Sequence, residues 1–151
     1  MLASLKQFFN SNTDDNNQMD VEHALRLAAA TLMVEVSRSD GDVSEQELAA
    51  LGNWLEQEFE LSESEVKELT VQARQASDDA ISLQGFTRQI CERWGPEQRQ
   101  NLVKYCWLIA LVDQHLDAHE RHTVRKIAGL LHLNDKETIL AKEAATQALR
   151  S

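Results

Sequence analysis

Hydrophobic residues recur along most of this chain at the spacing of an α-helix. A period near 3.6 connects five apolar positions in the first such segment: Val21, Leu25, Ala28, Leu32 and Val36. This segment is apolar around most of its circumference, which is typical of a helix buried at the centre of a fold. The run from Leu102 to Val112 has the same character. We therefore expect two central helices, one in each half of the chain.

Helix-start signals follow these two segments. In a capping box, a short polar side chain binds a backbone amide three residues later, and a glutamate at that position binds back. Four pairs have this pattern: Ser44 with Glu47, Ser62 with Glu65, Asp117 with Glu120, and Asn134 with Glu137. We expect each pair to open an amphipathic helix. Asp78 or Asp79 is expected to open another, which should end at Gly95, and Pro96 should begin the helix that follows it.

The second half of the chain repeats the order of the first. A central helix, an aspartate, a short acidic loop and two capped helices recur, with Asp40 corresponding to Asp113 and Glu47 to Glu120. This order predicts an all-α fold, a compact bundle of about seven to eight helices built from two pseudo-symmetric, duplicated halves. Residues 1–18 are expected to form a short amphipathic helix that docks on the body, followed by an acidic linker. Residues 19–151 should form the helical domain.

Composition supports a helical, soluble protein. One proline and five glycines among 151 residues favour helices. The net charge of −10 opposes binding to nucleic acid. Cys91 and Cys106 lack the spacing of a zinc or redox motif and are expected to be reduced, buried thiols of a cytoplasmic protein. The longest apolar run, Cys106 to Val112, is too short to cross a membrane.

The two acidic segments raise the possibility of a cation site. Capping and the helix dipole account for the residues at the helix starts, but not for Asp40 and Asp113, which follow helix ends where the dipole disfavours an anion. Ca²⁺ and Mg²⁺ bind such carboxylates. The candidate ligands are Asp40, Asp42, Glu47, Asp113, Asp117 and Glu120. In the alternative interpretation, Asp40 and Asp113 accept hydrogen bonds from loop amides or from an arginine, and no ion is bound.

Three histidines accompany the second acidic segment. His119 and His122 lie about one helical turn apart, and His115 shortly precedes them. This spacing could attract Zn²⁺ or Ni²⁺. The first segment has no histidines at the matching positions, so we favour solvent-facing side chains.

The stretches Ser37 to Leu51 and Ala110 to Leu133 resemble the two acidic segments of the tellurite-resistance TerB-like family. The resemblance extends over about Val21 to Leu149. The family in turn resembles the cytosolic helical domain of membrane-anchored DjlA-type co-chaperones. It implies a compact all-α domain of two related halves, acting as a non-enzymatic, cation-binding module in membrane-associated stress responses of bacteria. By position, the family's acidic residues correspond to Asp40, Glu47, Asp113 and Glu120, whereas Gln114 replaces the glycine of the second segment.

No catalytic set is recognisable in the sequence. A nucleophile paired with a base, a glycine-rich phosphate loop and a zinc-protease motif are all missing, so we expect that the protein is not an enzyme. The leading hypothesis is a cation-responsive module that binds a protein partner, which could be membrane-associated and hold the chain at the inner face of the membrane. The alternative is an ion-independent acidic scaffold or a co-chaperone-like module.

Overall fold

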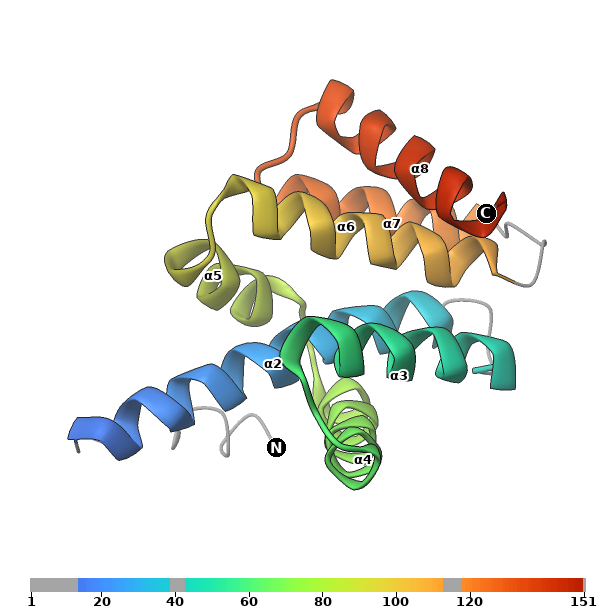
Figure 1. Ribbon diagram of the computed structural model, residues 1–151. Coiled ribbons are helices and arrows are strands. Elements are labelled where there is room, and N and C mark those ends of the chain that lie inside the picture. Colours follow the sequence, from blue (N-terminus) through green and yellow to red (C-terminus); the bar gives the residue numbers. More distant parts are fainter. Residues whose placement is uncertain (1–13, 39–42, 113–117, 151) are drawn as a thin grey trace.

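Seven α-helices make up the part of the chain that the computed structural model describes, residues 14–38, 43–112 and 118–150 (Figure 1). They are α2 (Asp14–Arg38), α3 (Glu45–Phe59), α4 (Glu63–Asp79), α5 (Gln84–Arg93), α6 (Pro96–Leu111), α7 (Ala118–Leu130) and α8 (Asp135–Arg150). These residues contain no β-strand, so the all-α prediction is confirmed. The amino-terminal helix predicted near residues 1–9 lies outside the described residues.

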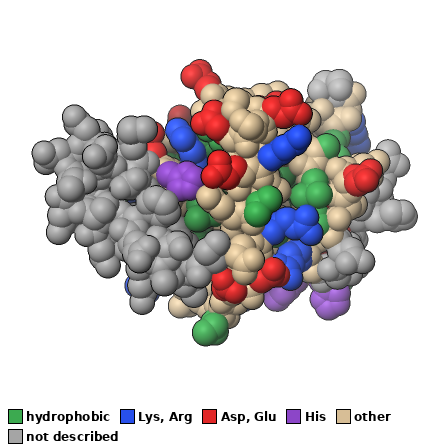
Figure 2. All heavy atoms as spheres, turned by 90° about the horizontal axis from the view of Figure 1, so that it is seen from below, with side chains coloured by type: hydrophobic (Ala, Val, Ile, Leu, Met, Phe, Trp, Pro, Cys, Tyr) green, Lys and Arg blue, Asp and Glu red, His purple; other side chains and the backbone are tan. Residues whose placement is uncertain are grey.

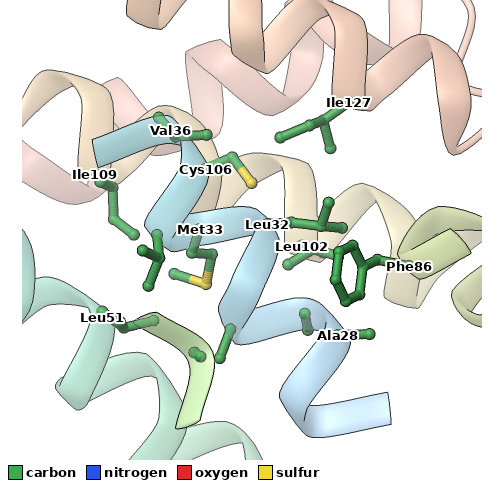
Figure 3. Close-up of a cluster of buried hydrophobic side chains, with 14 of the residues drawn as sticks. Ala28, Leu32, Met33, Val36, Leu51, Phe86, Leu102, Cys106, Ile109 and Ile127 are labelled. Carbon is green, nitrogen blue, oxygen red and sulfur yellow. The ribbon is translucent and has the colours of Figure 1, made fainter. Parts of the chain in front are cut away.

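The two central helices, α2 and α6, pack against each other and organise the core. Figure 3 shows Leu32 and Met33 of α2 surrounded by Leu51 of α3, Phe86 of α5 and Leu102 of α6. All five side chains are almost completely buried. Full burial of a leucine side chain stabilises a fold by about 1.5–3 kcal/mol. The apolar periodicity of these segments therefore predicted their central position correctly.

The helices that follow α2 and α6 pack in matching ways. Helix α2 packs on α4, and α6 packs on α8. Helix α3 contacts α6, whereas α7 contacts α2. The ends of α3 and α7 also match, because the described non-glycine residues with positive φ are Glu60 (54°) and His132 (65°). This left-handed conformation, common at helix ends, terminates both helices.

Capping boxes open three of the helices as predicted. The side chain of the first residue accepts a hydrogen bond from the glutamate amide, and the glutamate accepts one from the amide of the first residue. These pairs are Ser44 with Glu47 at α3, Ser62 with Glu65 at α4, and Asn134 with Glu137 at α8. The fourth predicted pair includes Asp117, which lies outside the described residues. Pro96 is the first residue of α6, also as predicted.

Two boundaries differ from the sequence prediction. Helix α2 begins at Asp14 rather than Met19, because extending a formed helix costs far less than nucleating one, even where the sequence is polar. Asp78 and Asp79 end α4 rather than opening α5. Helix α5 begins at Gln84, and its N-cap residue, Leu83, provides no side-chain hydrogen bond. Asp78 instead forms an ion pair with Arg38 at the end of α2.

Charge is mixed on the face of the molecule that includes α4. Figure 2 shows acidic and basic side chains interspersed there, with isolated hydrophobic side chains between them. The net charge of −10 is therefore not displayed as a uniformly acidic surface on this face.

Candidate functional site

Glu47 is a buried carboxylate in the first turn of α3. Its Oε1 accepts a hydrogen bond of 3.0 Å from the Ser44 amide, while Ser44 Oγ accepts one of 3.1 Å from the Glu47 amide. Only 1% of the residue is exposed. Burial of a carboxylate is unfavourable unless its charge is compensated. The capping role fixes the position of Glu47, and the surrounding helices bury it.

The capping box of α4 shows that burial is not required for this local geometry. Ser62 and Glu65 form the same two hydrogen bonds, of 3.0 Å and 3.2 Å, yet Glu65 is exposed. Glu47 and Glu65 therefore have the same local role in different surroundings. The burial of Glu47 is a property of the tertiary structure rather than of the capping motif.

Glu120 is the second buried glutamate, and it also lies in the first turn of its helix, α7. It is 1% exposed, like Glu47, to which it corresponds in the sequence repeat. Figure 1 shows the amino-terminal ends of α3 and α7 and the carboxy-terminal ends of α2 and α6 towards the same side of the molecule, on the right of the view. The structure thus places both predicted glutamates at one end of the bundle.

The other four candidate ligands, Asp40, Asp42, Asp113 and Asp117, lie outside the described residues. Within the described ranges, no three His, Cys, Asp or Glu side chains are grouped closely enough to hold a metal ion. The described chain therefore contributes two buried carboxylates to the candidate site.

A hydrogen-bonded network joins the end of α2 to α4 beside the first acidic segment. Ser77 Oγ donates a hydrogen bond of 2.5 Å to Glu35 Oε1 and accepts one of 3.2 Å from Arg38 Nη1. Arg38 also forms an ion pair with Asp78. Arg38 lies at the start of the first acidic segment, and this network engages its guanidinium with α4.

The described histidines of the second acidic segment lie at the surface, whereas the two cysteines lie in or against the core. His119 and His122 are exposed, which agrees with the solvent-facing interpretation, and His115 lies outside the described residues. Cys106 is fully buried in α6, and burial raises its pKa to about 12. Burial also raises the pKa of the half-buried Cys91 thiol. Raised thiol pKa values disfavour the reactive thiolate. Both thiols are free; Cys106 is buried as predicted, whereas Cys91, also expected to be buried, is only half-buried.

The sequence did not reveal an aromatic cluster at the opposite end of α3. Trp54 and Phe59 of α3 lie near Trp94 and Tyr105, with ring centroids 5.3–6.2 Å apart. Phe59 and Trp94 are 35 positions apart in the sequence. Their meeting depends on the packing of α3 against the junction of α5 and α6, and no local sequence signal indicates it.

A family model described as "Tellurite resistance protein TerB" matches residues 26–143, more than half of the chain. The chain belongs to the TerB family. This confirms the resemblance found in the two acidic segments, both of which lie entirely within the matched range. The comparisons with curated proteins and with solved structures gave no match.

Membership of the TerB family indicates a helical module related to tellurite resistance. None of the helices in the described part of the chain is both long and apolar enough to span a membrane. The buried glutamates Glu47 and Glu120 are within the matched range, as are all four candidate aspartates.

Proposed function

We propose that this chain is a non-enzymatic TerB module that binds a divalent cation, such as Ca²⁺ or Mg²⁺, at the end of the bundle where α3 and α7 begin. In this proposal, ion binding controls association with a protein partner during a tellurite-related or other membrane-associated stress response. The partner binds at or beside the ion site and can hold the chain at the inner face of the membrane.

The burial of Glu47 carries the proposal. Glu65 has the same capping geometry while its side chain remains exposed, so capping alone does not explain why Glu47 is buried. Divalent cations such as Ca²⁺ and Mg²⁺ prefer carboxylate oxygens, and Glu47 fixes one such group at the start of α3. Glu120, equally buried at the start of α7, would contribute in the same way.

Two glutamates do not provide enough oxygen atoms for such an ion. Ca²⁺ takes about six to eight oxygen ligands, and Mg²⁺ takes six, often with several waters. In the proposed site, Asp40 and Asp42 supplement Glu47, while Asp113 and Asp117 supplement Glu120. Backbone carbonyl groups and water complete the coordination.

The matching packing of the two halves supports an ion site to which both halves contribute equivalent residues. The contacts of α2 with α4 and α7 correspond to those of α6 with α8 and α3. Glu60 and His132, at the ends of α3 and α7, also share a left-handed backbone. We therefore include a pseudo-twofold relation between the halves in the proposal, with Glu47 and Glu120 as equivalent residues.

Thermal unfolding of the full chain tests for ion binding. The midpoint is measured in EDTA and then with excess Ca²⁺, Mg²⁺, Mn²⁺ or Zn²⁺. A ligand at a hundredfold excess over its dissociation constant stabilises the folded state by about 2.7 kcal/mol. We expect Ca²⁺ or Mg²⁺ to raise the midpoint by several degrees. Identical midpoints in EDTA and in every cation would contradict the proposal.

A double variant, Asp40→Asn with Asp113→Asn, distinguishes an ion site from a turn. If the aspartates bind the ion, the variant loses the stabilisation by Ca²⁺ or Mg²⁺, while its stability in EDTA is unchanged or slightly higher because repulsion is reduced. Equal destabilisation with and without the ion would assign Asp40 and Asp113 to turn hydrogen bonds. That result would favour the ion-independent acidic scaffold or co-chaperone-like module.

A further inference from the structure

A cavity of about 210 Å³ lies between α2, α3 and the junction of α5 with α6. It differs from the proposed ion site, because the helical rise separates Glu47 from Phe59 by about 18 Å along α3. Its lining combines aromatic rings with charged side chains, including Glu22, Arg26, Trp54, Glu58, Phe59 and Trp94.

Aromatic rings form one part of the cavity wall. The Phe59 and Trp94 ring centroids are 6.2 Å apart, with an angle of 36° between the ring planes. Trp54 meets Phe59 edge to face, at 5.3 Å and 73°. The faces of such rings attract cations through their quadrupole. Phe59 and Trp94 are only half-buried, so a group entering from solvent can reach this wall.

Carboxylates surround the aromatic wall. Glu22 and Glu58 line the cavity, and both are exposed. Burial and the negative charge of Glu58 raise the pKa of the neighbouring Tyr105 hydroxyl. Glu58 therefore acts electrostatically on one ring of the aromatic cluster. Aromatic faces beside two carboxylates favour an organic cation over a neutral or anionic group.

Arg26 shows which cation this wall accepts. The central carbon of its guanidinium lies 5.4 Å from the centroid of the Phe59 ring, and Arg26 Nη2 is 3.5 Å from Glu22 Oε2. The side chains of Arg26 and Glu22 are 28% and 66% exposed. Exposed ion pairs of this kind are weak, so an incoming cation can replace Arg26 at small cost.

We propose that this cavity binds an arginine side chain of a protein partner, which displaces Arg26 from the face of Phe59. The guanidinium of the partner lies on Phe59, beside Trp94, and pairs with Glu22 and Glu58. Arg26 acts as an internal competitor that lowers the affinity of the empty site. The proposal extends beyond the ion site and holds whether or not an ion is bound there.

Titration of the full chain with acetyl-arginine amide, followed by NMR of the tryptophan indole groups, tests the proposal. We expect saturable shifts of the Trp94 signal. Acetyl-citrulline amide has nearly the same shape without the charge, and it should cause no saturable shift. Absence of saturation with the arginine probe, or the same response to both probes, would overturn the proposal.

Three single variants test whether the arginine probe binds in this cavity. Arg26→Gln should tighten binding about two- to fivefold, the factor for an exposed cation–π contact of about 0.5–1 kcal/mol. Lys67→Gln removes an equal charge from an exposed position of α4 that does not line the cavity, and it should change affinity less. Glu58→Gln, at an exposed position, should weaken binding. Equal effects of the two charge removals, or unchanged affinity in Glu58→Gln, would contradict the assigned site.

Discussion

At the scale of single residues, the charge of a capping glutamate makes stability depend on pH. Hydrogen bonds from the Ser62 backbone and side chain lower the pKa of Glu65 from its ordinary value of 4.5. The folded state thus binds this proton less tightly than the unfolded state. A lowered pKa contributes stability above the unfolded value, and that contribution is lost as pH falls through the folded value.

The variant Glu65→Gln should therefore be less stable than the native chain at pH 7, and the difference should shrink as the pH falls from 4.5 through the lower pKa of the folded state. Glutamine keeps the acceptor atom for the Ser62 amide but has no charge to titrate. Urea unfolding of both chains between pH 7 and pH 3 measures the difference. A stability difference that remains constant over this range would show that the charge of Glu65 has no role.

At the scale of helices, Ser77 couples the end of α2 to the end of α4. It is 5% exposed and connects Glu35 to Arg38, while Arg38 also pairs with Asp78. The network fixes how the two helices approach each other beside the first acidic segment. Stability at this joint depends on side chains from both helices.

Ser77→Ala should destabilise the fold by about 1–3 kcal/mol, because it removes hydrogen bonds to two charged groups. Gln75→Ala is a suitable control, since Gln75 is exposed on the same helix and its change should stay within about 0.5 kcal/mol. Chemical unfolding of both variants gives the comparison. A loss in Ser77→Ala no larger than that in the control would show that the network does not stabilise the joint.

Local signals predicted the helices well but not their partners. Periodicity and capping boxes identified α3, α4 and α8, because both signals act within a few residues. Asp78 was misinterpreted as a helix start because its pairing with Arg38 involves a residue distant in sequence. Glu47 and Glu65 have the same local pattern, so the sequence could not show that only Glu47 is buried. The aromatic cavity required the same tertiary information.

At the scale of the whole molecule, the two proposed binding sites, for an ion and for an arginine side chain, lie at separate places on one helical scaffold. The starts of α3 and α7 bring the buried glutamates to one end of the bundle (Figure 1). The aromatic cavity lies at the other end of α3. In the proposed mechanism, an ion at the first place changes the charge of a protein with a net charge of −10, and so alters its attraction to a basic partner.

Titration calorimetry with Ca²⁺ and Mg²⁺ tests the ion site most directly. The metal-free native chain is compared with a Glu47→Gln, Glu120→Gln double variant and with the Glu65→Gln control, which changes a matched but exposed capping residue. The account predicts saturable binding of Ca²⁺ or Mg²⁺ by the native chain and the control, and at least tenfold weaker binding, about 1.4 kcal/mol, by the double variant. Equal affinities in all three chains, or no binding by the native chain, would contradict it.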